Sequence, residues 1–217
     1  MPTLSLCFVT DRHEPRKEAV AKMKLSPKIQ KAINTACSLH LGQERKVDGL
    51  PFIVHPFSVS LILLNYTNSE EIIIAGLLHD VLEDAKIYSF HDLIKDFGDN
   101  IAKIVREVSE DKDSHIQEDK KATWKARKTK YITNLKNAGQ GALMVSCADK
   151  IHNLTALMDA YSREKEMVWS KFNAPKEEIL WNYREVINVL REKLNNDIMK
   201  ELDNVHHSFL KTIGINT

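Results

Sequence analysis

Apolar residues recur along most of this chain at intervals of three and four positions, with polar residues between them. That spacing places apolar side chains on one face of an α-helix, and few segments show the strict alternation of a β-strand. The sequence therefore predicts an all-α fold, a bundle of helices around a single core that 217 residues are enough to build. We expect one domain over residues 26–206, with tails at 1–25 and 207–217.

Capping residues, prolines and glycines indicate where the helices begin and end. Ser26, Ser69 and Ser89 each precede a segment with helical spacing, as N-cap residues do, and Gly98 separates two such segments. A turn is expected at residues 139–141. The expected helices cover residues 27–41, 56–65, 70–84, 90–97, 99–109, 120–136 and 142–154, with a further helix to about 162 and one long C-terminal helix from 173 to beyond 202.

Two segments are apolar on every side rather than on one face. Residues 72–78 and 142–148 are almost wholly apolar, so helices there would be buried all round in the middle of the protein. His79 and Asp80 follow the first segment directly, and Asp149 follows the second. Because a bare charge is costly to bury, these groups must be paired with opposite charges or bound to a metal ion.

A third candidate ligand precedes the second predicted helix. Pro56 disfavours helical geometry at His55 and can itself open a helix, so we expect His55 at a fixed position just before that helix. With His79, Asp80 and Asp149 it offers two imidazoles and two carboxylates. Such a ligand set without thiolate suits Mn²⁺, Fe or Zn²⁺, and the carboxylates favour Mn²⁺, with other divalent metal ions as alternatives.

Each of these residues also has a simpler explanation. A His-Asp dipeptide is more often a helix cap or part of an ion pair than a metal site, and Asp149 can be explained by a salt bridge to Lys150.

Glu83 lies four residues after His79 and three after Asp80, so a continuous helix would place all three near one face. We therefore expect the Glu83 carboxylate one turn from the metal, where it can accept a proton from an attacking water.

Composition narrows the classes of function. The net charge of +1 gives no overall attraction to nucleic acid or to a membrane surface. The three cysteines, Cys7, Cys37 and Cys147, lack C-x-x-C spacing, which favours reduced thiols in the cytoplasm over a disulfide framework. No apolar stretch has the length of a membrane span. We expect a cytoplasmic protein that acts on a small molecule, and a homo-oligomer is left open.

Residues 120–136 form a basic run without an acidic residue. Most such runs are the solvated face of a helix. Beside a metal centre, the run could instead form one wall of an anion site, because clustered cations raise the local concentration of phosphate esters. The sequence leaves both alternatives open.

Four motifs connect these residues to a known family. The pattern H…HD…D resembles the HD-domain metal-dependent phosphohydrolases, which are helical bundles. More narrowly, over roughly residues 25–157 the chain is similar to the hydrolase domain of the RelA/SpoT-type alarmone enzymes and to the small alarmone hydrolases. The motifs are G-Q-E-R-K-V-D-G-L-P-F-I-V-H-P, A-G-L-L-H-D-V-L-E-D, F-G-D-N-I-A-K-I-V-R-E-V-S-E-D-K and V-S-C-A-D-K-I-H-N-L.

The resemblance implies an activity and a role for each motif. The implied activity is hydrolysis of the 3′-diphosphate of guanosine 3′,5′-bis(diphosphate), with release of pyrophosphate. Glu83 and Asp84 would place and activate the attacking water. The implied ligands of a Mn²⁺ ion are His55, His79, Asp80 and Asp149, and the implied substrate contacts are Arg45, Lys46, Lys150 and Asn153.

Departures from the family pattern keep two alternatives open. Thr155 stands where the long alarmone enzymes have arginine, and residues 123–132 and 179–184 resemble stand-alone bacterial HD proteins. The alternatives are an HD phosphohydrolase that acts on a nucleoside monophosphate or on the 2′-phosphate of NADPH, and a non-catalytic nucleotide-binding module. Glu83 and Asp84 argue against the second, because a binding module needs no water-activating pair. One helical domain leaves no room for a synthetase, so an enzyme that only degrades is expected.

Overall fold

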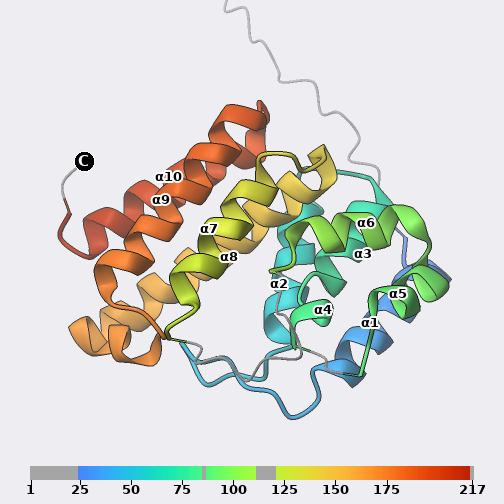
Figure 1. Cartoon of the computed structure of the whole chain (residues 1–217), viewed down its shortest axis with the longest axis horizontal. Coiled ribbons are helices and arrows are strands. Elements are labelled where there is room, and N and C mark those ends of the chain that lie inside the picture. The colour runs from blue at the N-terminus through green and yellow to red at the C-terminus, as the bar shows by residue number, and fades with distance from the viewer. Residues whose placement is uncertain (1–23, 85–86, 111–120, 216–217) are drawn as a thin grey trace, which may run out of the picture.

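A computed structural model describes residues 24–84, 87–110 and 121–215 of the chain, and these residues are mostly helical (Figure 1). Within these ranges the β-structure is limited to an isolated bridge between Glu44 and Pro51. The prediction of an all-α fold is confirmed. The elements are α1 (Pro27–Leu39), α2 (Val54–Leu63), α3 (Glu70–Leu78), α4 (Val81–Asp84), α5 (Phe90–Phe97), α6 (Asp99–Val108), α7 (Trp124–Leu135), α8 (Gln140–Glu164), the 3₁₀ helix η1 (Lys165–Lys171), α9 (Lys176–Lys193) and α10 (Asp197–Thr212).

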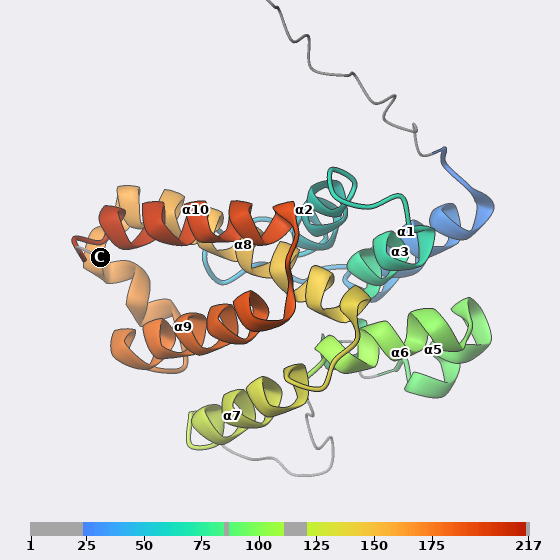
Figure 2. The ribbon, with the colours of Figure 1, turned by 90° about the horizontal axis from the view of Figure 1, so that it is seen from above.

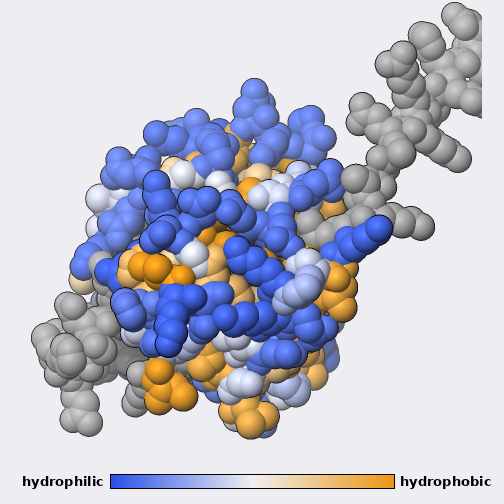
Figure 3. Space-filling view, turned by 90° about the vertical axis from the view of Figure 1, so that its right-hand side faces the viewer, coloured by the Kyte–Doolittle hydropathy of each residue, from blue (hydrophilic) through white to orange (hydrophobic). Residues whose placement is uncertain are grey.

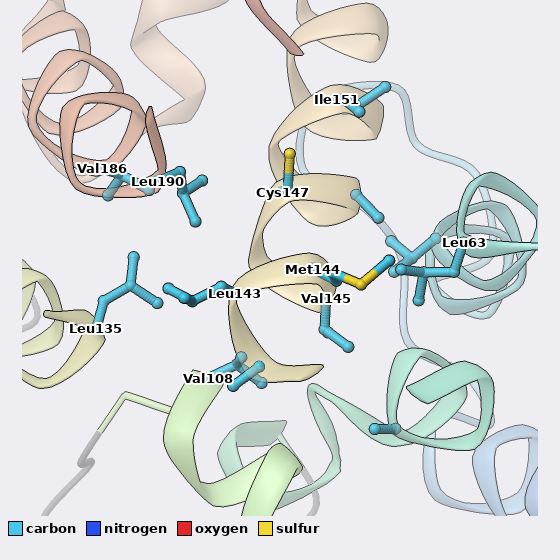
Figure 4. Packing of buried hydrophobic residues seen from close by; sticks show 14 of the residues in the cluster. Leu63, Val108, Leu135, Leu143, Met144, Val145, Cys147, Ile151, Val186 and Leu190 are labelled. Atoms are coloured by element: carbon cyan, nitrogen blue, oxygen red, sulfur yellow. The ribbon is translucent and has the colours of Figure 1, made fainter. Parts of the chain in front are cut away.

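The longest helix, α8, connects the two ends of the bundle. It contacts α2, α3 and α6 as well as α9 and α10, and Figure 2 shows α9 and α10 gathered at one end and α1, α3, α5 and α6 at the other. Residues 142–149 are all buried. In Figure 4, Leu143 faces Leu135 of α7 and Leu190 of α9, whereas Met144 extends toward Leu63 of α2. The apolar segment is therefore surrounded on all sides, as the sequence predicts.

The contact between α2 and α3 depends on a glycine. A Cβ atom on Gly76 would lie 2.6 Å from Cδ1 of Leu63 and 3.1 Å from Oγ of Ser60, so no larger residue fits without movement. Residues 73–78 of α3 are all buried, which confirms the other segment predicted to be apolar on every side. The two helices that carry His55 and His79 are thereby held in close contact.

Two boundaries in the N-terminal half differ from the prediction. Helix α2 begins at Val54, so His55 lies in its first turn rather than before it. Pro56 is tolerated there because the first turn of a helix does not use the backbone N–H of that residue. The helix expected over 70–84 ends at Leu78, and α4 follows as a separate short helix after a turn at His79 and Asp80.

The C-terminal half is also divided differently. Helix α8 begins at Gln140 and continues to Glu164, so residues 140–141 belong to it rather than to a turn. The single C-terminal helix of the prediction is two helices, because the chain is extended at Asn196 with φ of −149°. Helix α10 continues to Thr212 with Phe209 buried, so the folded part extends past the expected boundary at 206. The expected tail at 1–25 lies almost entirely outside the described residues.

One face of the molecule can be followed in Figure 3. Hydrophilic residues cover much of the face seen in Figure 3, and hydrophobic residues gather there in smaller patches. Among the helices that the structure describes, none is both long and apolar enough to cross a membrane.

Replacing Gly76 with alanine tests the α2–α3 contact. We expect Gly76→Ala to lower the free energy of unfolding by about 1–3 kcal/mol, because the new methyl group overpacks a closed contact against Leu63. Urea denaturation measures the change. Gly139→Ala is the matched control, since its Cβ would meet only Oε2 of Glu107 at 3.4 Å. Equal stability of the two variants would show that α2 and α3 separate without cost.

Candidate metal centre

The four predicted metal ligands come together at one point. Nε2 of His55 lies 3.1 Å from Nε2 of His79 and 3.1 Å from Oδ1 of Asp149. Oδ2 of Asp80 lies 3.1 Å from Nε2 of His79 and 3.5 Å from Nε2 of His55. Residues far apart in the sequence are thus brought within reach of a single cation.

Different helices hold these side chains. His55 lies in the first turn of α2, His79 is the C-cap residue of α3, and Asp149 lies on α8. Nδ1 of His79 is 2.9 Å from the carbonyl oxygen of Gly76. Since that nitrogen donates its proton to the carbonyl, Nε2 is left as the acceptor and faces the centre.

His152 orients the imidazole of His55. No role was predicted for His152 from the sequence. Its Nδ1 lies 2.8 Å from Nδ1 of His55 and 3.5 Å from Nη1 of Arg45. Burial, His55 and Arg45 lower the pKa of His152 to about 4, so the ring is neutral and its Nδ1 accepts hydrogen bonds. The position of His152 one helical turn after Asp149, in the motif D-K-I-H-N, was a signal that could have indicated it.

The electrostatics of the centre favour a cation. Burial lowers the pKa of His79, but Asp80 and Asp149 outweigh burial and raise it to about 9. Burial raises the pKa of the Asp80 carboxyl, and His79 and His55 outweigh it so that the pKa falls below its ordinary value. Two ionised carboxylates therefore face the imidazoles, and a divalent cation can take the place of the proton between them.

Asp149 has further partners on its own helix. Nζ of Lys150 lies 2.5 Å from its Oδ2, and Nδ2 of Asn153 lies 2.5 Å from its Oδ1. Although burial raises the pKa of Asp149, Lys150 and His55 bring it well below the usual value. Lys150 and Asn153 were predicted to bind substrate; both line the cavity described below, and their contacts in the structure hold Asp149.

The donor set fits a divalent transition metal ion. One ligand atom each from His55, His79 and Asp80 lie within 4.8 Å of one another, and Asp149 adjoins them. Imidazole nitrogen and carboxylate oxygen are ligands that Mn²⁺, Fe and Zn²⁺ accept. With four protein ligands, a six-coordinate ion keeps positions for other oxygen ligands.

The centre opens into a cavity of about 930 Å³. The cavity is bounded by the loop at 43–52, by α7 and α8, and by parts of α6 and α9. Glu83 lines it, and its Oε1 accepts a hydrogen bond of 2.8 Å from the backbone N–H of Glu110. The side chain of Asp84 lies outside the described part of the structure, so its predicted role stays a prediction.

The predicted substrate loop lies at the mouth of the same cavity. Arg45 is buried, and its Nε is 3.0 Å from Oδ2 of Asp48. Lys46 is exposed and also lines the cavity. Arg45 is thus held in place by Asp48, while the neighbouring ammonium group is available to solvent and to an anion.

The basic run forms a wall of the cavity along α7. Arg127, Lys128 and Lys130 line it, as the second of the two alternatives requires, and binding of an anion there stays a prediction. Nη1 of Arg127 lies 2.6 Å from Oε2 of Glu110, and Lys128 bonds the other oxygen of that carboxylate. Lys125 projects elsewhere and pairs with Glu178 of α9. One face of α7 therefore presents cations to the cavity, with Glu110 fixing their position.

Comparison with known proteins identifies the family. The HD domain matches residues 32–180, which is more than half of the chain. The chain belongs to the HD-domain family.

Relatives with assigned names narrow the comparison. The chain is 33% identical over 156 residues to guanosine-3′,5′-bis(diphosphate) 3′-pyrophosphohydrolase MESH1 of Drosophila melanogaster, covering 67% of this chain and 82% of that protein. It is 34% identical over 132 residues to a guanosine-3′,5′-bis(diphosphate) 3′-pyrophosphohydrolase of Borreliella burgdorferi, covering 59% of this chain. The match spans only 19% of the length of that bacterial relative.

Solved structures agree on the fold. A metazoan orthologue of SpoT, described as hydrolysing ppGpp, superposes with a TM-score of 0.68 and 26% identity, covering 89% of this chain and 99% of that one. A protein of Listeria monocytogenes superposes with a TM-score of 0.61 and 28% identity, covering 73% of this chain and 98% of that one. The helical bundle and its order of helices are therefore those of the HD-domain hydrolases.

Metal binding is expected to stabilise the protein through Asp80. Mn²⁺ at a hundredfold excess over its dissociation constant should add about 2.7 kcal/mol to the free energy of unfolding, because it binds only the folded chain. Asp80→Asn removes one charged ligand and should abolish that shift, measured by thermal denaturation with metal analysis of the purified protein. Asp159→Asn, on the exposed end of α8, is the control and should keep the shift. An unchanged shift in Asp80→Asn would exclude Asp80 as a ligand.

His152 is expected to strengthen metal binding without contacting the ion. His152→Leu removes the acceptor for Nδ1 of His55 and should weaken Mn²⁺ binding about 10–100-fold. Competition with a fluorescent chelator measures the dissociation constant. His152→Asn, which keeps an acceptor, should lose less affinity, and equal losses in the two variants would show that the hydrogen bond to His55 contributes nothing.

Proposed function

We propose that this chain hydrolyses the 3′-diphosphate of guanosine 3′,5′-bis(diphosphate) and releases pyrophosphate. The observation that supports this most strongly is the position of the centre. His55, His79, Asp80 and Asp149 meet at the inner side of a cavity of about 930 Å³ whose α7 wall carries Arg127, Lys128 and Lys130. A cavity of this size accommodates a nucleotide, and its basic wall suits the diphosphate groups. The names of the relatives support the same substrate.

Mn²⁺ is the proposed cation, held by the two imidazoles and the two aspartates. When bound, a divalent ion neutralises phosphoryl charge and makes water a better nucleophile at neutral pH. The chain's contribution is to orient the ligands. His152 and the carbonyl of Gly76 fix the two imidazole rings, and Lys150 and Asn153 fix Asp149.

Glu83 is the proposed general base. Its carboxylate lines the cavity next to the centre and is held from one side by the backbone N–H of Glu110. A carboxylate so held can accept the proton of the attacking water without leaving its position. Asp84 would assist it. Lys46, Lys150 and Asn153 are the proposed substrate contacts near the centre, and Arg45 is proposed to contact the base or a phosphate.

We place this activity in the cytoplasm. Cys37 is exposed and Cys147 is buried, and both are free thiols in the described structure, as expected of a reducing compartment. The proposed partner is the small nucleotide alone, with neither nucleic acid nor membrane involved, and a homo-oligomer is compatible with the proposal.

A nucleotide panel tests the function and the role of Glu83 together. In the presence of Mn²⁺, the wild-type chain should release pyrophosphate from guanosine 3′,5′-bis(diphosphate) in preference to phosphate from guanosine monophosphate or NADPH. Glu83→Gln should lower kcat by about 10²–10⁴-fold, because it removes the general base. Its nucleotide affinity, measured by calorimetry, should stay near the wild-type value.

Glu192→Gln, an exposed change on α9, is the control for this experiment and should leave kcat unchanged. Preferential turnover of NADPH or of a monophosphate would replace the proposed substrate with that nucleotide. Parallel loss of binding and turnover in Glu83→Gln would assign Glu83 to binding instead of proton transfer.

A further inference from the structure

Asn182 is a buried polar residue of α9. Its side-chain oxygen, Oδ1, lacks a hydrogen-bond partner in the part of the chain that the structure describes. Only 8% of the surface of Asn182 is exposed, and the residue lines the cavity that contains the metal centre. A buried amide oxygen without a partner costs about 1–3 kcal/mol. Such a group is uncommon in native proteins, so its presence beside a cavity calls for an explanation.

Helix packing does not require asparagine at this position. Residues three or four positions apart share a face of a helix, and Ile179, Tyr183 and Val186, all buried, occupy the face on which Asn182 lies. An apolar side chain at 182 would continue that face and leave no polar group to satisfy. Asparagine is therefore less favourable than an apolar residue for the stability of α9, and a donor that enters the cavity would satisfy its oxygen.

The chemistry of the unpaired Oδ1 atom defines which kind of ligand group it can bind. An amide oxygen accepts hydrogen bonds, so its partner must carry an N–H or O–H group. Phosphate oxygens at neutral pH accept hydrogen bonds, so they cannot supply this donor. The cations of α7 in the same cavity are suited to bind them. A nucleotide has its donors on the base and on the ribose. Rotation about the last side-chain bond of Asn182 turns the oxygen toward a donor in the cavity.

We propose that Asn182 binds a hydrogen-bond donor of the nucleoside part of the substrate, either an N–H of the base or the ribose 2′-hydroxyl. Asn182 is then a residue that determines which nucleoside the cavity accepts, and it takes no part in the chemical step. This inference rests on the proposed function only in that the ligand is a nucleotide.

Three variants of the full chain test the proposal by calorimetric titration with guanosine 3′,5′-bis(diphosphate) in EDTA, where no turnover occurs. Asn182→Leu should weaken binding about tenfold, because the ligand donor loses its acceptor. The same variant should raise the melting temperature, since an unpaired buried group is removed. Asn182→Thr keeps a neutral hydroxyl oxygen as an acceptor, so it should lose less affinity than Asn182→Leu.

Asn196→Leu is the matched control. Asn196, at the start of α10, also has a buried Oδ1 without a partner, but it is not among the residues that line the cavity. Nucleotide affinity should be unchanged in this variant. If Asn196→Leu weakens binding as much as Asn182→Leu does, the effect is a general one on folding and the proposal is overturned.

Two analogues identify the donor. The 2′-deoxy analogue lacks the ribose hydroxyl, and the inosine analogue lacks the 2-amino group of guanine. The analogue that lacks the true donor should bind the wild type more weakly, and Asn182→Leu should cause it little further loss. If the leucine variant weakens both analogues by the full factor, the remaining donor at N1 of the base is the partner.

The outcomes separate this inference from the proposed function. If the wild type binds guanosine 3′,5′-bis(diphosphate) but does not hydrolyse it with Mn²⁺, the proposed substrate is wrong, and the inference is still decided by the titrations. Wild-type affinity in Asn182→Leu overturns the inference. So does a loss in Asn182→Thr as large as that in Asn182→Leu, because that result would mean that an acceptor at position 182 contributes nothing to binding. Absence of any binding by the wild type in EDTA overturns the inference, whereas the proposed function is decided by the assay with Mn²⁺.

Discussion

The pairing of one buried and one half-buried carboxylate with two buried imidazoles is the constraint on which this structure depends. An isolated carboxylate inside a helical bundle would cost several kcal/mol, so Asp80 and Asp149 can be buried only where partners surround them. His55 and His79 provide those partners from α2 and α3, and Lys150 adds a cation from α8. The three helices must therefore meet at one place, and the apolar segments that precede the polar residues are what bring them there.

The basic wall of the cavity is connected to Glu83, the proposed general base, through Glu110. Glu110 follows α6, donates its backbone N–H to Glu83 and binds Arg127 and Lys128 through its carboxylate. Burial raises the pKa of Glu110, but these cations outweigh it and keep the carboxyl ionised. One residue thus positions the proposed general base and the basic wall of α7 relative to each other.

Local signals predicted much of this arrangement. The serines at 26, 69 and 89 cap helices as expected, because an N-cap acts within a single turn. The four candidate ligands could be predicted because three of them directly follow apolar segments and all of them belong to recognisable motifs. The separation of α9 from α10 at Asn196 was missed, since the apolar stripe continues through the break and only tertiary packing decides it.

His152 and Asn182 were missed for a related reason. A sequence shows which residue types are present. It does not show which polar atom lacks a hydrogen-bond partner, or which side chain forms a hydrogen bond to a candidate metal ligand. His152 acts through the Nδ1 of His55, which requires knowing that the two rings meet across α2 and α8. Asn182 lies among apolar residues of α9 that the sequence assigns to core packing. Its possible role can be recognised only when the cavity beside it is known.

Gly76 affects how the two imidazoles of the centre are placed. The absence of a side chain at this position allows α2 to approach α3, and its carbonyl oxygen anchors the ring of His79. The distance of 3.1 Å between the two Nε2 atoms is therefore set by the packing of two helices. Repacking that contact would move the two imidazoles relative to each other, so residues that do not line the centre help to determine its geometry.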